Sequence, residues 1–377
     1  MRQITQYWRQ FRTPLLAGLV FAYSLIALSM IIEGDGRGLF NTTLVFSPVL
    51  VFIPTYLQVK YNALTHPKAF LAGERGARLL QQRRVQEAIP FLQQATQLNP
   101  DLAIHHHNLG LAYFTLGRWQ SALFCFDAAI QRDPRSHPTY TMRANIHLMH
   151  QRLDDALADA TSAIHIKPNY VLAYALRGVI HQQRGDNDSA IIDFETCIRR
   201  EPTFVEAYLN LGTAYANRGE RQHAIALYTQ AINIDPQYGL AYNHRAFERA
   251  RHGDLSAALQ DADQSVRIMA NHPAPYGTRG MVYFLMNRYA QSVNDFQQSR
   301  RIQASYHFAT AGLAAAYHAL GNTVNVEEAL RLWRSLIDAN TKFTDLEWVQ
   351  RELSLPDPII DQARQIIHTI EVDSLSS

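Results

Sequence analysis

The chain is poor in cysteine and in charged residues, and both shortages restrict what it can be. Two cysteines in 377 residues cannot form the framework of a disulfide-stabilised fold. Charged residues make up 18% of the chain, below the roughly 25% of a typical soluble domain. The formal net charge of +2 gives no support to nucleic-acid binding. The hydrophobic fraction of 47% excludes a mainly disordered chain.

The sequence also lacks the signatures of catalysis. It contains no phosphate-binding loop, dinucleotide fingerprint or nucleophile elbow. His105, His106 and His107 cannot face one metal ion, because successive residues on a helix point about 100° apart. Cys125 and Cys197 occupy packing positions, so we expect buried thiols. We therefore expect no enzyme, no catalytic residues, no metal, no cofactor and no small-molecule substrate.

Two long uncharged segments stand near the N-terminus. Residues 13–32 and 38–59 hold no charged side chain, and each is long enough to cross a hydrocarbon core of about 30 Å as a helix. A short glycine-rich linker separates them, so residues 1–60 predict a membrane anchor made of a transmembrane helical hairpin. Two alternatives remain open. The first segment could be a cleaved signal peptide, and the second, which contains Pro48 and Pro54, could be re-entrant.

The charges that flank these segments predict an orientation. Arg2, Arg9 and Arg12 precede the first segment, Lys60 and Lys68 follow the second, and the linker carries a net charge of −1. Positive charge favours the cytoplasmic side. We therefore expect a multi-pass protein of the cell membrane with two spans, both termini in the cytoplasm and the rest of the chain beside them.

The rest of the chain repeats itself every 34 residues. The proline series is Pro100, Pro134, Pro168, Pro202 and Pro236, and the tyrosine series is Tyr140, Tyr174, Tyr208, Tyr242 and Tyr276. Small residues follow the same period. Within one unit, apolar residues twice recur at helical spacing, with a glycine between the two groups. Each unit therefore predicts two amphipathic helices joined by a turn.

This pattern resembles the tetratricopeptide repeat (TPR) family, and one unit carries its positions most completely, in Leu109-Gly110, Tyr113, Ala122, Phe126 and Pro134. The resemblance implies an all-α fold, a right-handed TPR solenoid of about eight helix-turn-helix repeats over residues 69–343. The predicted units are 69–102, 103–136, 137–170, 171–204, 205–238, 239–272, 273–306 and about 307–343, the last one degenerate.

The C-terminal end predicts a cap for such an array. Residues 344–371 favour two short helices, with Asp345 as an N-cap and an isoleucine-rich apolar stripe in the second helix. A helix that lies on a membrane surface is the alternative for that stripe. Residues 372–377 are expected to be a tail.

One position inside the repeat alternates between charged and apolar pairs. Four arginines are followed 16 residues later by an aspartate, whereas Leu109 and Leu211 are followed by Cys125 and Leu227. The charged pairs are Arg143 and Asp159, Arg177 and Asp193, Arg245 and Asp261, and Arg279 and Asp295. Because a half-buried charge needs a partner, we expect structural ion pairs. An anion site made of the four arginines is the alternative.

The resemblance implies that the first helix of each repeat lines a concave surface. Its inward positions are His107, Leu111, Phe114, Asn145, Leu148, Met149, Val179, Gln182, Leu209, Thr213, Asn217, Asn243, Phe247, Met281 and Phe284. They are apolar with scattered amides and contain no lysine, which favours an apolar helix or extended segment of a protein partner over a clamped C-terminal carboxylate. The alternative is that these residues only pack against one another.

These features together predict a membrane-anchored TPR protein of bacterial type. Its expected function is that of a non-catalytic scaffold or adaptor for protein–protein interaction, which binds a protein segment in the concave groove. Two alternatives stay open. The protein could be an assembly factor or chaperone for a membrane protein complex, or a regulatory subunit of a membrane enzyme.

Overall fold

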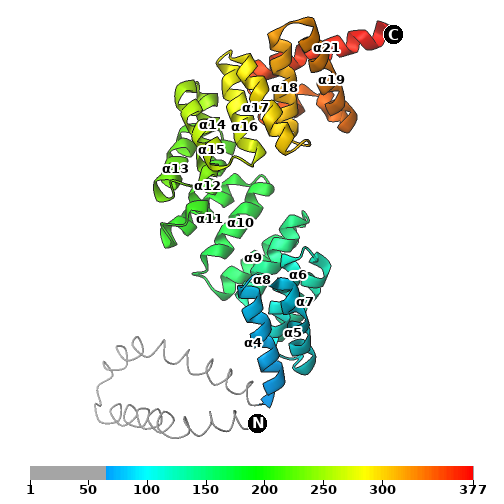
Figure 1. Ribbon diagram of the computed structural model, residues 1–377. Coiled ribbons are helices and arrows are strands. Elements are labelled where there is room, and N and C mark those ends of the chain that lie inside the picture. The colour runs from blue at the N-terminus through cyan, green and yellow to red at the C-terminus, as the bar shows by residue number, and fades with distance from the viewer. Residues whose placement is uncertain (1–64, 377) are drawn as a thin grey trace, which may run out of the picture. The chain divides into compact units, whose positions relative to one another are not determined.

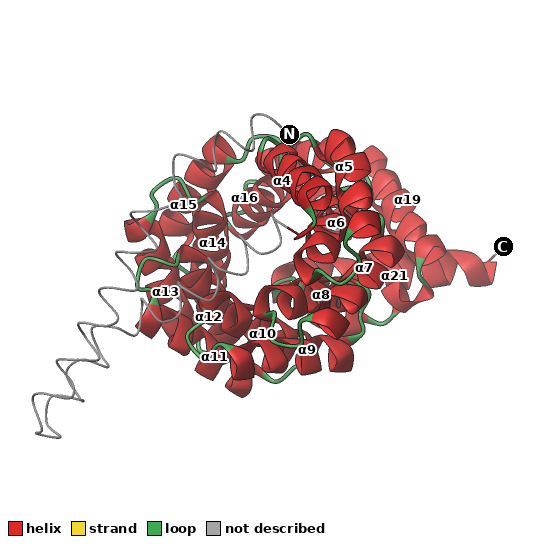
Figure 2. Cartoon of the chain, turned by 90° about the horizontal axis from the view of Figure 1, so that it is seen from below, coloured by secondary structure: helices red, strands yellow, loops and turns green. Residues whose placement is uncertain are grey.

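The computed structural model describes residues 65–376, and every element in this part of the chain is a helix (Figures 1 and 2). The segments predicted to span a membrane, 13–32 and 38–59, lie outside the described residues. Among the helices that are described, none has both the length and the apolar character needed to cross a bilayer.

The described helices follow one another in pairs. The first helices of the pairs are α4 (Pro67–Gln81), α6 (Ala103–Thr115), α8 (His137–Met149), α10 (Val171–Gln183), α12 (Val205–Asn217), α14 (Gly239–His252), α16 (Pro273–Leu285) and α18 (His307–Leu320). The second helices are α5 (Val85–Leu98), α7 (Trp119–Arg132), α9 (Leu153–Ile166), α11 (Asn187–Arg200), α13 (Arg221–Ile234), α15 (Leu255–Ile268), α17 (Tyr289–Ile302) and α19 (Thr323–Ala339). The second helices begin 34 residues apart throughout. The predicted all-α fold of helix-turn-helix repeats is therefore confirmed.

The described residues fall into two compact units, divided between Ala128 and Ala129. Within the second unit, each first helix contacts the first helix of the next pair, from α8 to α18, whereas the second helices make no comparable contacts with one another. The first helices are thus closer together than the second helices. They form the inner side of the stack in this unit, as expected for a curved solenoid.

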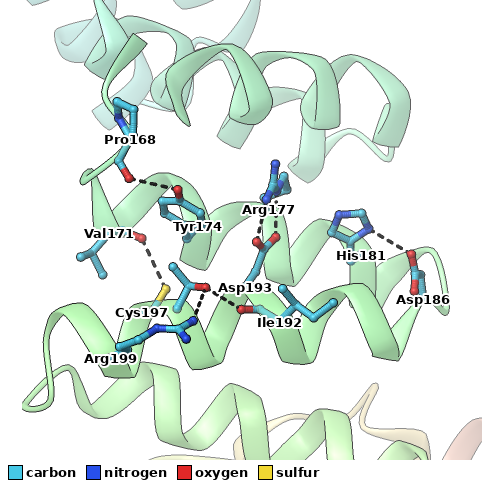
Figure 3. A network of polar contacts seen from close by, with 11 residues as sticks. Pro168, Val171, Tyr174, Arg177, His181, Asp186, Ile192, Asp193, Cys197 and Arg199 are labelled. Carbon is cyan, nitrogen blue, oxygen red and sulfur yellow. Dashed lines mark hydrogen bonds and ion pairs between the residues drawn. The ribbon is translucent and has the colours of Figure 1, made fainter. Parts of the chain in front are cut away.

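A hydrogen bond joins two of the periodic series seen in the sequence. The hydroxyl of Tyr174 donates to the carbonyl oxygen of Pro168 at 3.0 Å (Figure 3), and the hydroxyl of Tyr208 donates to that of Pro202 at the same distance. In an earlier repeat a histidine replaces the tyrosine, and Nε2 of His106 lies 2.7 Å from the carbonyl oxygen of Pro100. The aromatic residue therefore fixes the loop that enters its own first helix.

The distance between the two helices of a pair depends on one small residue. A Cβ added to Gly212 would lie 2.5 Å from Cε1 of Tyr228, a distance that no real side chain tolerates. In the repeat of α8 and α9 the corresponding residues are Ala144 and Ala160, both fully buried in one cluster. A glycine on the first helix thus accompanies a large ring on the second helix, and alanine accompanies alanine, as close packing of the two helices requires.

The predicted arginine–aspartate pairs are confirmed. Each of the four arginines donates two hydrogen bonds of 2.7–2.8 Å to its aspartate, and Figure 3 shows this for Arg177 and Asp193. The arginines are therefore engaged in structural pairs and do not form a shared anion site. Arg75, which has no such aspartate, lies over the ring of Phe91 with its Cζ 4.1 Å from the ring centroid.

The C-terminal end covers the last pair. The second helix α19 has 17 residues against the 14 of α17, and its longer course brings Trp333 into the core, where Nε1 donates to the carbonyl oxygen of Phe343 at 3.2 Å. A 3-10 turn, η1 (Thr341–Thr344), and a short helix, α20 (Leu346–Leu353), follow. Asp345 caps α20 by accepting hydrogen bonds from two backbone N–H groups, as the sequence predicts.

The last helix, α21 (Asp357–Ser376), packs against α18 and α19 with its isoleucine stripe buried. His318 and Gln362 join it to α18 at 2.7 Å. The stripe is thus covered by the repeat array. The tail expected over 372–377 is instead helical as far as Ser376. An ion pair of 3.0 Å between Arg334 and Asp373 ties these last turns to α19.

Candidate functional site

All the predicted partner-binding residues lie on first helices, from α6 to α16. Side-chain exposure separates them into groups that can and cannot offer a free surface. The residues of α8, α10 and α12 include the most exposed ones, those of α14 and α16 are largely enclosed, and those of α6 belong to the other compact unit.

The inner faces of α8, α10 and α12 carry exposed apolar side chains. Met149 is 54% exposed at the end of α8, and Leu172 is 51% exposed at the start of α10. Leu148 and Val179 are half-buried beside them, and Asn145 is also half-buried. Leu172 is missing from the residues predicted from the sequence. Its position in the repeat, one residue into the first helix, also carries a large apolar side chain in four other units, as Phe70, Ile104, Leu240 and Phe308. The 34-residue period therefore held a signal for Leu172 that the sequence prediction missed.

One amide of this face joins neighbouring first helices, whereas the hydroxyl of Thr213 bonds within its own helix. Nε2 of Gln182 donates to the backbone carbonyl of Asn210 on α12 at 3.1 Å. The hydroxyl of Thr213 donates to the carbonyl of Leu209 at 3.0 Å, and Leu209 itself is only 8% exposed. Gln182 therefore joins α10 to α12, and the hydroxyl of Thr213 is satisfied within α12.

A further amide marks the end of this face. Asn217, an exposed residue at the end of α12, donates through Nδ2 to Oδ1 of Asn187 at 3.5 Å. This long bond connects α12 to the second helix of the preceding pair, so Asn217 is held at the border of the face.

The first helices of the C-terminal repeats use the same positions for packing. Met281 is fully buried and Phe284 is 3% exposed. Phe247 is half-buried, with its ring centroid 6.3 Å from that of Phe308 on α18. These three predicted residues therefore hold α14, α16 and α18 together in this structure and present little surface to a partner.

In the first compact unit the predicted residues also contact aromatic rings. The ring centroid of His107 lies 5.8 Å from that of Phe126, and burial lowers the pKa of His107 to about 4. Phe114 packs edge-on against Trp119 at 5.5 Å, and Leu111 is half-buried. His107 is consequently neutral at physiological pH, so this part of the face carries no positive charge from it.

A buried polar cluster on α14 was not predicted from the sequence. Glu248 is 5% exposed, burial raises its pKa, and its Oε2 lies 3.6 Å from Nε of Arg221, too far for a hydrogen bond. On the same helix, Oδ1 of Asn243, a predicted inward residue, is buried without a hydrogen-bond partner. The sequence held one signal for this cluster, since a charged residue occupies a position where the neighbouring repeats carry Ala214 and Val282.

The groups that could carry metal or thiol chemistry are few. Within residues 65–376, no group of three His, Cys, Asp or Glu side chains is placed to hold a metal ion. Cys125 and Cys197 are free and buried, and burial raises the pKa of their thiols to about 11 and about 12. Both thiols are therefore protonated at neutral pH and poor nucleophiles.

Comparison with known protein families identifies the repeat. Tetratricopeptide repeat models match residues 103–136, 171–204 and 205–238, and a further TPR model matches residues 76–117. The chain thus contains tetratricopeptide repeats. A curated relative, Protein STIP1 homolog of Dictyostelium discoideum, is 39% identical over 72 residues, which are 19% of this chain and 13% of that protein. The match therefore spans only a small part of either chain.

Solved structures show the same fold. A tetratricopeptide repeat protein from Parabacteroides merdae superposes with a TM-score of 0.56 at 18% identity, over 66% of this chain and 98% of that one. The APC/C hetero-tetramer Cut9-Hcn1 gives a TM-score of 0.57 at 16% identity, over 70% of this chain and 52% of the other. At these identities the likeness shows the fold alone, a TPR solenoid.

Proposed function

We propose that this chain of tetratricopeptide repeats is a non-catalytic, membrane-anchored scaffold that binds a protein segment on the inner face of α8, α10 and α12. The observation that carries the proposal is the exposure of Met149 and Leu172 on this face, 54% and 51%. A contiguous apolar patch on a protein surface is typical of an interaction site.

The chemistry of the face indicates the kind of segment it accepts. Its apolar side chains are accompanied by the amides of Asn145, Gln182 and Asn217 and by no arginine or lysine. Apolar contacts with a few amide hydrogen bonds suit an uncharged helix or extended peptide. A strongly acidic or basic segment would lose hydration on this face without gaining an ion pair.

The segments 13–32 and 38–59 supply the membrane anchor in this proposal. Anchoring confines the repeats to the bilayer surface, so a partner in the same membrane meets them at a raised effective concentration. The charge bias around the two segments favours a cytoplasmic position for the repeats. Alkaline extraction of membranes that contain the full chain tests this part, because an integral protein stays in the pellet. Release into the supernatant would contradict a two-span anchor.

Site-specific photo-crosslinking tests the inner face directly. A photoreactive phenylalanine analogue is placed at Met149 or Leu172 in the full chain, and at Ile192 as a matched control. Ile192 is 63% exposed, but it lies on the second helix α11. We expect one partner polypeptide to be crosslinked from Met149 and Leu172 and not from Ile192. Equal crosslinking from all three positions, or crosslinking from Ile192 alone, would place the binding face elsewhere.

A further inference from the structure

A cavity of about 480 Å³ lies between α4 and α5, on the first helix pair that the structure describes. Its lining combines the apolar side chains of Leu71, Leu79 and Phe91 with the guanidinium groups of Arg75 and Arg78. None of these residues belongs to the inner face proposed above. The cavity is therefore a separate candidate site, and its chemistry can be derived from the repeats themselves.

Arg75 occupies the position at which four later repeats carry a paired arginine. In those repeats an aspartate of the second helix accepts both hydrogen bonds of the guanidinium. Here Phe91 stands in place of the aspartate, and Arg75 lies over its ring at 4.1 Å. Among the described residues, no carboxylate pairs with Arg75. A guanidinium stacked on a ring keeps its in-plane N–H groups available for an acceptor.

Two acidic side chains also line the cavity, and only one of them is engaged. Glu87 accepts two hydrogen bonds from Arg84, at 2.7 and 2.6 Å. Glu74 is exposed and forms no ion pair among the described residues. Arg84 and Glu87 neutralise each other, so the remaining charged side chains of the lining are Arg75, Arg78 and one carboxylate, that of Glu74. The cavity therefore retains a positive excess.

The later repeats show what lies next to this arginine. Arg279 on α16 donates one hydrogen bond of 2.9 Å to Asp263, which belongs to α15, the second helix of the preceding repeat. Arg245 on α14 likewise donates to the hydroxyl of Thr229 on α13, the preceding second helix, at 3.0 Å. The side of the guanidinium that points away from its own repeat is thus the place where a neighbouring helix presents an oxygen acceptor.

Within residues 65–376, no helix covers the corresponding side of the first described pair. Leu71 is 61% exposed, whereas Ala207 and Ala241, at the same position of later repeats, are fully buried. Residues 36–66, which lead into α4, contain no Asp or Glu. The chain segment directly before the cavity therefore cannot supply the carboxylate that Arg75 lacks.

We propose that the cavity between α4 and α5 binds a helix of a partner protein that presents an Asp or Glu carboxylate to Arg75. Apolar side chains of that helix pack against Leu71 and Leu79. The bond between Asp263 and Arg279 is the internal template for the contact, and charge-assisted bonds from guanidinium to carboxylate are among the stronger ones in proteins. This site goes beyond the inner face of α8, α10 and α12 and uses none of its residues.

A pair of labelled peptides tests the proposal with the full chain in detergent. The acidic probe has the sequence of α15, residues 255–268, because that helix presents Asp263 to an arginine of the same series. The matched probe carries Asn in place of Asp263. Fluorescence anisotropy should show that the acidic probe binds at least about tenfold more tightly than the matched probe. Equal binding of both probes, or no binding of the acidic one at about 1 mM, overturns the proposal.

Charge reversal identifies the arginine. R75E should weaken binding of the acidic probe by at least about tenfold, and a probe with Lys in place of Asp263 should bind R75E better than the unchanged chain. K68E is the control, because Lys68 is exposed, lies on the same helix and does not line the cavity. Equal effects of R75E and K68E overturn the proposal. The rescue by the lysine probe separates a lost contact from a first repeat that fails to fold.

Light scattering measures self-association and so tests whether a second copy of this chain supplies the helix. If the full chain self-associates and R75E abolishes that association, the occupant is a second copy and the assignment to a partner protein is wrong. Absence of crosslinking from Met149 and Leu172 in a chain that keeps Arg75 would count against the proposed function. It would leave this inference untouched, because Arg75 lies outside the inner face.

Discussion

Arg177 and Asp193 stand 16 residues apart in the chain and are joined by two parallel hydrogen bonds of 2.8 Å across the two helices of one repeat. Asp193 is 2% exposed, so the bonds lie in a partly desolvated setting. In the next repeat the same contact is made by Leu211 and Leu227, which belong to one apolar cluster. The fold thus accepts an ion pair or an apolar pair at this place, and in the six repeats from α6 to α17 the two members change together.

This relationship predicts the stability of three variants. Asp193→Ala should lower the free energy of unfolding by about 3 kcal/mol, because it leaves the half-buried guanidinium of Arg177 without an acceptor. The double variant R177L/D193L, which copies Leu211 and Leu227, should stay within about 1 kcal/mol of the unchanged chain. Urea unfolding of the full chain followed by circular dichroism measures all of them. A double variant as unstable as Asp193→Ala would show that the pair is needed for more than mutual compensation.

The contact between Gly212 and Tyr228 predicts a coupled substitution. Gly212→Ala should destabilise the chain by about 1–3 kcal/mol, since Tyr228 is 1% exposed and cannot move aside. In a chain that already carries Tyr228→Ala, the further substitution Gly212→Ala should leave the free energy of unfolding almost unchanged, because Ala144 and Ala160 coexist two repeats earlier. A double-mutant cycle gives the coupling.

Gly219 is the control for that cycle. It has a φ of +85° in the turn and nothing within 4 Å of an added Cβ. Gly219→Ala should therefore cost about 1 kcal/mol through backbone strain, whichever residue stands at 228. If Gly212→Ala costs the same in both backgrounds, the ring of Tyr228 is not what requires the glycine.

Acidification should weaken the first compact unit through His105. This residue is 4% exposed, its Nε2 is buried without a hydrogen-bond partner, and burial lowers its pKa from 6.5 to about 4. Between these two values the unfolded chain binds a proton that the folded chain does not. The stability is therefore full above the unfolded pKa and is lost as the pH falls below it.

The loss from His105 should reach about 2 kcal/mol near pH 5. His105→Gln removes the titrating group. The fall in the free energy of unfolding between about pH 7 and about pH 5 should therefore be smaller in this variant by that amount. Denaturant unfolding at a series of pH values provides the measurement. An unchanged slope in the variant would assign the acid sensitivity to other groups.

The two thiols should be unreactive in the folded protein. Burial raises the pKa of Cys125 to about 11 and that of Cys197 to about 12, and the thiol of Cys197 also lies 3.5 Å from the carbonyl oxygen of Val171. Reaction with a disulfide reagent near pH 8 should be at least about 100 times slower than in denaturant, since the thiolate is the reacting form. Fast native labelling of either residue would indicate local opening of its repeat.

Much of the fold could be predicted from this sequence because each repeat uses the same short-range contacts. Tyr174 and Pro168 are 6 residues apart, and Arg177 and Asp193 are 16 residues apart. Both contacts recur in other repeats at the same separation. The proposed inner face was harder to predict. Periodicity placed Met149 and Met281 on first helices alike, but it could not tell that one is 54% exposed and the other fully buried.

The sequence by itself determined the repeat length, the two helices of each unit and the partners within a unit, because these depend on contacts between residues close in the chain. Only the tertiary structure decided which of the equivalent positions remain accessible. That outcome depends on neighbouring repeats: Phe308 of α18 packs against Phe247 of α14, and α21 covers α18 and α19. The open cavity beside Arg75 has the same origin, because what covers a repeat is supplied by the next helix in space and not by the repeat itself.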